Sequence, residues 1–234
     1  MRVAFFRPSE YAEDTARLFR QAGFQVFHVP MIRIEELAAS VGDADFTIIT
    51  SQTSAKIAVR DRLIRGDVIA IGPKTAEVLR RAGFDVRIPS RYDSSTVFRE
   101  FRDVVAGKTV NLLRSDRGDP VLLKLSEVCD LNEYVLYRIV PARGVEQRRA
   151  VREVVGGRID AVVFSSRMIV RAFMENAESE GLTGEAVDAL NRMVTVAIGP
   201  PTADELSKYG VRSRVPERYT FEGVLGLLRE LRRT

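Results

Sequence analysis

Short, continuous apolar runs alternate along the chain with longer segments in which apolar residues recur every three or four positions. The short runs lie at 3–6, 47–49, 68–71, 110–113, 162–164 and 194–198. Such runs are typical of strands that are buried on both faces of a parallel sheet. The longer segments, such as 12–22 and 97–105, have the spacing of amphipathic helices. The pattern therefore predicts an α/β protein with helices on both sides of parallel sheets.

Part of this pattern occurs twice with nearly the same residues. Segment 70–92 is matched by 197–219, and about half of the aligned positions are identical, including an Ile-Gly-Pro-x-Thr-Ala element. Upstream, 45–51 resembles 160–166, and 3–7 resembles 109–114. An internal repeat of this extent predicts a duplicated structural unit.

The order of the repeated pieces is not a simple tandem, which predicts that one domain is inserted into another. We expect two flavodoxin-like parallel-sheet α/β domains joined by a two-stranded antiparallel β linker. Domain 1 is predicted at 1–32 plus 142–234, and domain 2 at 35–133. The linker is predicted at 28–34 and 134–141, two extended segments that interrupt the alternation of strand and helix.

The composition of the 234 residues, 45% hydrophobic and 29% charged, is that of a globular protein with a core. No apolar run approaches the roughly 18 residues of a membrane-spanning helix, and no apolar signal segment follows Met1. We therefore expect a cytoplasmic protein without a membrane partner. One cysteine and one histidine leave no zinc, haem or iron–sulfur cluster, so no metal or cofactor is expected. Cys129 and His28 are interpreted as packed residues.

Arginine far outnumbers lysine among the 36 basic residues, and the net charge is +4. Guanidinium groups pair bidentately with carboxylates and phosphates, which favours an anionic ligand. Solvation of the surface is the competing interpretation for most of these arginines. No run of consecutive basic residues marks a nucleic-acid-binding arm, so no nucleic acid partner is expected.

Small polar residues follow four of the predicted strands, where ligands bind in open parallel sheets. Each set also opens a predicted helix, whose N-terminus favours an anion. The candidate binding residues are Thr50, Ser51, Gln52, Gly72, Lys74, Thr75, Ser165, Ser166, Arg167, Gly199, Pro200 and Thr202. Arg7 and Arg114 end equivalent strands of the repeat and are candidates for binding ligand carboxylates. Helix capping, turn formation and solvation are the competing interpretations.

Tyr137 is the candidate catalytic residue, because a crossing strand would place it where a ligand shared by both domains lies. A phenol can donate or accept a proton there. Aromatic packing is the competing interpretation. Neither a Gly-x-Gly-x-x-Gly fingerprint nor a Walker-type loop is present, which disfavours dinucleotide and ATP chemistry. A Ser-His-Asp triad would have to use His28.

Taken together, these elements resemble the uroporphyrinogen-III synthase family. The resemblance is carried by Arg7-Pro8, 49–51, 70–76, Leu113-Arg114, 135–137, 164–166 and 197–203. The Ile-Gly-Pro-x-Thr-Ala element is its most specific part. Ser165-Ser166-Arg167 departs from the commoner Thr-Ser-Pro of the family, which leaves the role of Arg167 open.

The resemblance implies a cofactor-free lyase of tetrapyrrole and haem biosynthesis. Such an enzyme cyclises hydroxymethylbilane, a linear tetrapyrrole polycarboxylate, to uroporphyrinogen III. Water is lost and the terminal pyrrole ring is inverted, through a spirocyclic pyrrolenine. By the same resemblance, Tyr137 assists departure of the hydroxyl group. We expect a monomer whose partner is this small molecule.

Two other classes remain as alternatives from the sequence. The main alternative is a two-lobed cytosolic small-molecule binding or sensor protein without catalysis, whose lobes would also carry polar strand ends. The other is a pair of domains like those of response regulators. Against it, Arg7-Pro8-Ser9 stands where a phospho-acceptor would need an acidic cluster.

Overall fold

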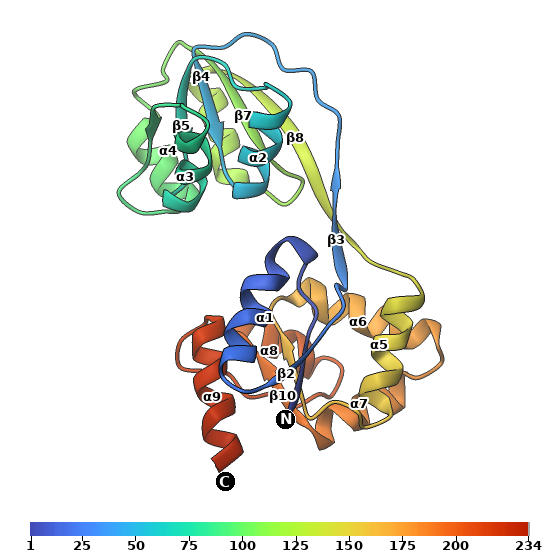
Figure 1. Ribbon diagram of the computed structural model, residues 1–234. Helices are drawn as coiled ribbons and strands as arrows, with labels where there is room; N and C mark the ends of the chain where they lie inside the picture. Colours follow the sequence, from blue (N-terminus) through green and yellow to red (C-terminus); the bar gives the residue numbers. More distant parts are fainter. Residues whose placement is uncertain (234) are drawn as a thin grey trace. The chain divides into compact units, whose positions relative to one another are not determined.

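The computed structural model describes residues 1–233, and the chain folds into two units. Unit 1 is made of residues 1–33 and of the chain from Val140 onward, and unit 2 of Ile34–Ile139. Figure 1 shows this by colour, because the blue N-terminal elements share a unit with the yellow-to-red ones. The two boundaries fall inside the segments 28–34 and 134–141 that the sequence marks as crossings.

Unit 1 contains a four-stranded sheet in the order β10-β9-β1-β2, and every neighbouring pair is parallel. Its strands are β1 (Arg2–Phe5), β2 (Gln25–His28), β9 (Ala161–Phe164) and β10 (Val194–Ala197). Its helices are η1 (Ser9–Tyr11), α1 (Ala12–Gln21), α5 (Val145–Val155), α6 (Arg167–Ser179), α7 (Thr183–Arg192), α8 (Pro200–Ser207) and α9 (Phe221–Arg233). The predicted α/β class with parallel sheets is confirmed.

Helices cover both faces of this sheet, which explains why its strands are mostly apolar. On one face, α1 and α9 pack against Val3, Phe5 and Val163. On the other face, Phe173 of α6 stacks on Phe6 with ring centroids 5.3 Å apart. The same side of the unit holds α5, α7 and α8, which pack with α6. Successive residues of a strand thus enter different cores, as the two-residue repeat of a strand requires.

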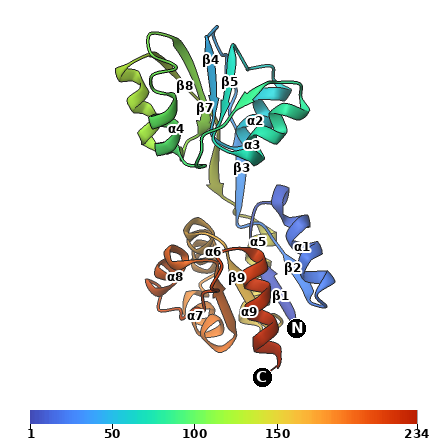
Figure 2. The same cartoon turned by 90° about the vertical axis from the view of Figure 1, so that its left-hand side faces the viewer.

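Unit 2 contains a six-stranded sheet in the order β3-β8-β7-β4-β5-β6. Its strands are β3 (Ile32–Glu36), β4 (Phe46–Ile49), β5 (Asp67–Ala70), β6 (Val86–Arg87), β7 (Thr109–Ser115) and β8 (Asp130–Pro141). Its helices are α2 (Gln52–Arg60), α3 (Pro73–Arg81), α4 (Ser94–Phe101) and η2 (Pro120–Glu127). Figure 2 shows α2 and α3 on one side of the sheet and α4 on the other.

Adjacent residues of β4 and β7 point into different cores of unit 2. Ile49 and Leu113 belong to the core under α2 and α3, whereas Ile48 and Leu112 belong to the core under α4 and η2. All four side chains are fully buried. The sheet is therefore covered on both faces, as in unit 1.

Strands β3 and β8 both pass the boundary between the units. They are neighbours in the six-stranded sheet, and the backbone N–H of Leu37 donates to the carbonyl of Leu136 at 2.9 Å. Strand β8 also pairs in parallel with β7 from Asp130 to Tyr137. The segment predicted as a crossing is thus the continuation of a strand that begins inside unit 2.

The pairing registers confirm the internal repeat residue by residue. The residues paired across the sheet are Phe5, Val163, Val196 and Arg214 in unit 1, and Leu112, Ile48, Ile69 and Arg87 in unit 2. Each residue of the first series is the repeat equivalent of its counterpart in the second. Four strands of the two sheets are therefore equivalent, namely β2, β1, β9 and β10 in unit 1 and β8, β7, β4 and β5 in unit 2.

Cys129 and His28 are packed residues, as predicted. The Cys129 thiol donates to the carbonyl of Leu125, and burial beside Asp130 raises its pKa. The His28 ring lies 5.2 Å from that of Phe5, with Nε2 2.8 Å from the Arg7 carbonyl. Within residues 1–233, no helix is long and apolar enough to cross a membrane, and no group of three or more His, Cys, Asp or Glu side chains is arranged to hold a metal ion.

Candidate active site

The predicted site residues form two groups, one in each unit, at the carboxyl ends of the parallel strands. In unit 1 they follow β1, β9 and β10, and in unit 2 they follow β4 and β5 or lie in β7 and β8. The loops after β4, β5, β9 and β10 each lead into a helix, namely α2, α3, α6 and α8. The first backbone N–H groups of a helix lack partners inside it, which makes such edges suited to anions. Helix α8 differs, because Pro200 and Pro201 have no N–H and the Thr202 N–H donates to the Gly199 carbonyl at 3.0 Å.

In unit 2 the loops after β4 and β5 are joined by a hydrogen bond. The Gln52 side-chain amide donates to the Lys74 carbonyl at 3.3 Å. Ser51 is the N-cap of α2, and its Oγ accepts the Ser54 N–H at 3.0 Å. Lys74 is exposed, whereas Thr75 is buried under the helix. Gln52 and Lys74 are therefore neighbours at this loop edge. Thr75 is buried in the first turn of α3.

Tyr137 reaches the same loop edge from β8. Its side chain is buried in the core under α2 and α3, and its hydroxyl donates to Ser51 Oγ at 3.1 Å. Ser51 Oγ in turn donates to Ser54 Oγ at 3.0 Å. The structure thus joins the candidate catalytic tyrosine to one of the candidate binding residues.

In unit 1 the loops after β9 and β10 have the same construction. Ser166 caps α6 by accepting the Ile169 N–H at 3.3 Å. The Ile198 N–H donates to the Phe164 carbonyl at 2.9 Å, matching the bond from Ile71 to Ile49 in unit 2 at 3.0 Å. The remaining candidates here are Ser165, half-buried, Arg167 and Pro200, exposed, and Gly199 and Thr202, buried.

Arg7, at the end of β1, is partly buried and incompletely hydrogen-bonded. One terminal nitrogen donates to Thr15 Oγ1 at 2.6 Å, and the guanidinium lies 4.6 Å from the centre of the Phe221 ring. Its Nε is buried and has no hydrogen-bond partner. Burial lowers the pKa of this guanidinium. A buried N–H donor without a partner is costly, so the group is prepared for an acceptor.

Arg114 occupies the equivalent place in unit 2 but is committed to internal contacts. Its Nε lies 2.5 Å from Glu133 Oε1, and a terminal nitrogen donates to the Asp119 carbonyl at 2.7 Å. Only 7% of its side chain is exposed. Strand register places His28 in unit 1 where unit 2 has Glu133, because Phe5 pairs with His28 and Leu112 with Glu133. Arg114 therefore has an acidic partner in the neighbouring strand, and Arg7 has none there.

Tyr92 and Tyr219 also lie at these loops, although the sequence analysis did not include them among the site residues. Their exposed fractions are 61% and 60%. Tyr92 lies against Gly72, and Tyr219 lies against Gly199. The signal that could have identified them was their identity at equivalent positions of the repeat.

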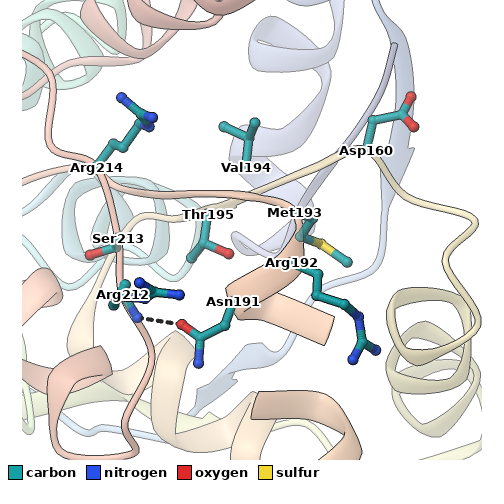
Figure 3. A pocket seen from close by; sticks show the side chains of 9 residues that line it. All are labelled: Asp160, Asn191, Arg192, Met193, Val194, Thr195, Arg212, Ser213 and Arg214. Carbon is teal, nitrogen blue, oxygen red and sulfur yellow. Dashed lines mark hydrogen bonds between the residues drawn. The ribbon is translucent and has the colours of Figure 1, made fainter. Parts of the chain in front are cut away.

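A cavity of about 510 Å³ lies elsewhere, at the amino ends of β9 and β10 (Figure 3). It is lined by Asp160, Asn191, Arg192, Met193, Val194, Thr195, Arg212, Ser213 and Arg214. The side chains of Arg192 and Arg214 point in different directions. The cavity contains none of the predicted site residues and lies at the opposite end of the strands, so we do not assign the active site to it.

Comparison with known proteins identifies the family of this chain. A family model described as "Uroporphyrinogen-III synthase HemD" matches residues 13–226. The chain belongs to the uroporphyrinogen-III synthase family. The predicted resemblance is thereby confirmed, and a binding or sensor protein without catalysis is not favoured.

Relatives within the uroporphyrinogen-III synthase family span nearly the whole chain. A putative uroporphyrinogen-III synthase of Archaeoglobus fulgidus is 42% identical over 230 residues, which are 98% of each chain. One of Methanocaldococcus jannaschii is 25% identical and covers 99% of each chain. The similarity thus extends over both units.

Solved structures of the family share the fold. A uroporphyrinogen III synthase from Thermus thermophilus has a TM-score of 0.60 at 20% identity and covers 100% of both chains. The Helicobacter pylori synthetase has a TM-score of 0.66 at 17% identity, covering 99% of this chain and 100% of its own. They support the two-domain α/β architecture.

Proposed function

We propose that this chain cyclises hydroxymethylbilane to uroporphyrinogen III, with loss of water and inversion of the terminal pyrrole ring. This is a lyase reaction of tetrapyrrole biosynthesis. The observation that carries the proposal is the family match over residues 13–226, which includes the candidate loops of both units.

The substrate carboxylates are bound, in this proposal, by the loops at the carboxyl ends of the strands. The N-termini of α2, α3, α6 and α8 offer the positive ends of helix dipoles, and those of α3 and α6 also offer backbone N–H groups. Helix α8 begins with Pro200 and Pro201, which have no N–H. The side chains that assist them are Thr50, Ser51, Gln52, Lys74, Ser165, Ser166 and Arg167. Thr75 and Thr202 are buried, and we assign them to supporting these turns.

Arg7, and not Arg114, is the arginine that we propose for a substrate carboxylate. Arg114 is already paired with Glu133 and is buried. Arg7 has no such acid in the adjacent strand, and its Nε lacks an acceptor. A carboxylate bound bidentately by Arg7 would supply one.

Selectivity for the inverted product is assigned to positioning. The linear substrate closes by itself to the uninverted isomer, so the enzyme must hold the terminal rings such that the other pyrrole carbon is attacked. Orientation of reacting groups can contribute several kcal/mol or more to a rate. Many fixed carboxylate contacts at these loops would restrict the chain of rings to one such arrangement.

Departure of the hydroxyl group as water requires a proton, and we propose that Tyr137 supplies it through Ser51. The Tyr137 hydroxyl donates to Ser51 Oγ, and Ser51 is half-buried at the loop edge. Ser51 can pass a proton to the leaving oxygen while taking one from Tyr137. The tyrosinate that results is reprotonated when the final ring carbon loses its proton.

The first experiment is an isomer assay on purified protein. Hydroxymethylbilane is supplied, the product is oxidised, and the porphyrin isomers are separated by chromatography. The type III isomer is expected in excess over the spontaneous type I product. A product of type I alone would refute the proposed function.

The second experiment compares Tyr137→Phe with Tyr134→Phe. Both tyrosines lie in β8, but the Tyr134 hydroxyl accepts the Gly42 N–H at 3.3 Å instead of contacting Ser51. Tyr137→Phe should fold and lower kcat about tenfold, less than a general acid commonly contributes, because substrate conformation carries most of the selectivity. Tyr134→Phe should retain the wild-type kcat. Equal effects of both variants would remove the proposed role of Tyr137.

We further propose a cytoplasmic monomer that acts on this small molecule without nucleic acid. The proposal uses residues of one chain only. Light scattering on the purified protein during size-exclusion chromatography should give the mass of a single 26.2 kDa chain. A dimer mass at assay concentration would contradict it.

A further inference from the structure

Two tyrosines at equivalent positions of the repeat are highly exposed beside the proposed substrate loops. Tyr92 follows β6 in unit 2, and Tyr219 precedes α9 in unit 1. Their exposed fractions, 61% and 60%, are nearly equal. Within the part of the chain that the structure describes, neither hydroxyl has a hydrogen bond.

Each tyrosine lies on the glycine that caps the adjacent helix. A Cβ atom on Gly72 would lie 3.0 Å from Tyr92 Cβ and 3.2 Å from its Cγ. A Cβ atom on Gly199 would lie 3.4 Å from Tyr219 Cγ. Both glycines have extended backbones, with φ of −176° and −167°, which any residue can adopt. Glycine is therefore needed at Gly72 for the close approach of Tyr92, whereas a Cβ atom on Gly199 would make an ordinary contact with Tyr219.

This contact fixes one part of each aromatic side chain and leaves the rest in solvent. A residue whose only task was to cover the glycine could do so with a smaller or more buried side chain. The repeat has instead kept tyrosine twice, within Pro-x-Arg-Tyr segments that differ at Ser90 and Glu217. An exposed aromatic surface at a ligand site points to a flat ligand.

We propose that Tyr92 and Tyr219 are two aromatic subsites, each of which packs against a pyrrole ring of the linear tetrapyrrole. The inference rests on the proposed function and deepens it. Carboxylates on the ring held by Tyr92 would reach the N-terminal amides of α3. Those on the ring held by Tyr219 would lie at the positive dipole end of α8, whose first two residues, Pro200 and Pro201, have no N–H. At each subsite a ring would thus be held by its face and by its acidic side chains together.

Packing against a pyrrole ring accounts both for the exposure of the two tyrosines and for their contact with a glycine. Stacking with aromatic side chains tolerates different ring substituents because it uses the π-face. It would therefore suit pyrroles that differ only in the order of their acidic side chains. The glycine beneath fixes the height of the aromatic plane above the helix N-terminus, which sets the distance from ring to amides.

Direct binding can be tested with a single tryptophan, because the chain contains none. In Tyr219→Trp, titration with uroporphyrinogen III should change the tryptophan fluorescence saturably. The control is Tyr209→Trp, placed beyond the opposite end of α8, which ends at Ser207. Its fluorescence should not respond at the same concentrations. Equal responses of both variants, or no response of Tyr219→Trp, would overturn the proposal.

Kinetics test the role in the reaction. Tyr92→Leu and Tyr219→Leu remove the flat ring and should each raise KM for hydroxymethylbilane about tenfold, with a smaller change in kcat. Tyr92→Phe and Tyr219→Phe keep the ring and should retain the wild-type KM. The Tm of the Leu variants should remain close to that of the wild type, because most of each side chain is exposed. A lowered Tm with unchanged KM would mean a purely structural role.

These outcomes separate the inference from the proposed function. If the wild type forms no type III isomer, the proposed function fails. If it forms that isomer and the Leu variants bind hydroxymethylbilane as well as the wild type, only the inference about the tyrosines fails.

Discussion

At the scale of single residues, Arg7 and Arg114 occupy equivalent positions of the repeat but have different partners. Their variants should therefore behave differently. Arg7→Gln should raise KM about tenfold with little change in Tm, since it removes a proposed carboxylate ligand and a buried unpaired donor. Arg114→Gln should lower Tm, because Glu133 and the Asp119 carbonyl lose their partner. Steady-state kinetics and thermal melting test both. The opposite assignment of effects would contradict our choice of Arg7.

Glu205 provides a residue-scale prediction about pH. It is buried, with its carboxylate 2.7 Å from Arg171 Nε and 2.8 Å from Lys208 Nζ. These hydrogen bonds lower its pKa from the ordinary 4.5 to about 2. A lowered pKa in the folded state stabilises the protein above the ordinary pKa, and the effect is lost as pH falls towards 2.

Glu205→Gln should therefore melt at a lower temperature than the wild type at pH 7, and the difference should vanish near pH 2. Melting curves over this range measure it. Glu77→Gln is the control, because its ion pair with Arg81 is exposed and contributes little. A difference for Glu205→Gln that stays constant from pH 7 to pH 2 would show that the carboxylate charge is not the cause.

The sequence allowed the residue types at the candidate site to be predicted, but not their partners. The repeat alone indicated that Arg7 and Arg114 were equivalent. That Arg114 pairs with Glu133 depends on the register of β8 against β7, which local sequence does not encode. The bond between Tyr137 and Ser51 likewise joins residues far apart in the chain. Long-range pairing therefore decides which candidates remain free.

At the scale of elements, the contacts of the glycine–proline turns before α3 and α8 predict how much stability each Gly→Ala variant should lose. Gly72→Ala should cost about 1–3 kcal/mol of unfolding free energy, because the new methyl group would lie 3.0 Å from the Cβ of Tyr92, an atom held close to the backbone. Gly199→Ala should cost less, because its nearest contact, at 3.4 Å, is close to ordinary. Urea unfolding measures both, and a larger cost at Gly199 would contradict this interpretation.

Most strands and helices were visible in the sequence because the strands covered on two faces are mostly apolar. The extended segment 134–141 was also recognised, but only as a crossing. The structure begins β8 at Asp130 and pairs it with β7 inside unit 2. An alternating pattern identifies an extended segment without identifying its neighbour, because that neighbour is set by the sheet as a whole.

At the scale of the whole molecule, the permuted order of the repeat was the strongest signal. It predicted two sheets of common design, with one inserted into the other, and the shared registers bear this out. The strand orders β2-β1-β9-β10 and β8-β7-β4-β5 are equivalent. The arrangement makes β1 depend on β2 and on β9, which follows it by more than 150 residues in the sequence, and not on strands of unit 2.

This dependence predicts which segments of the chain a core variant should destabilise. Phe173→Ala removes a fully buried ring that packs on Phe6 and Phe164, at an expected cost of about 3–5 kcal/mol. Hydrogen exchange measured by mass spectrometry should accelerate in peptides of 1–28 and of 145–233. Peptides from β4 to β7 should exchange as in the wild type, because their core is separate.

The reciprocal variant is Leu112→Ala, which opens the core under α4 and η2. It should accelerate exchange in unit 2 and leave peptides of β1 and α1 unchanged. Together the two variants test whether sequence neighbours or sheet neighbours unfold together. If Phe173→Ala accelerated exchange equally in all peptides, the two units would unfold as one cooperative body. Their separate cores would then not give them separate free energies of unfolding.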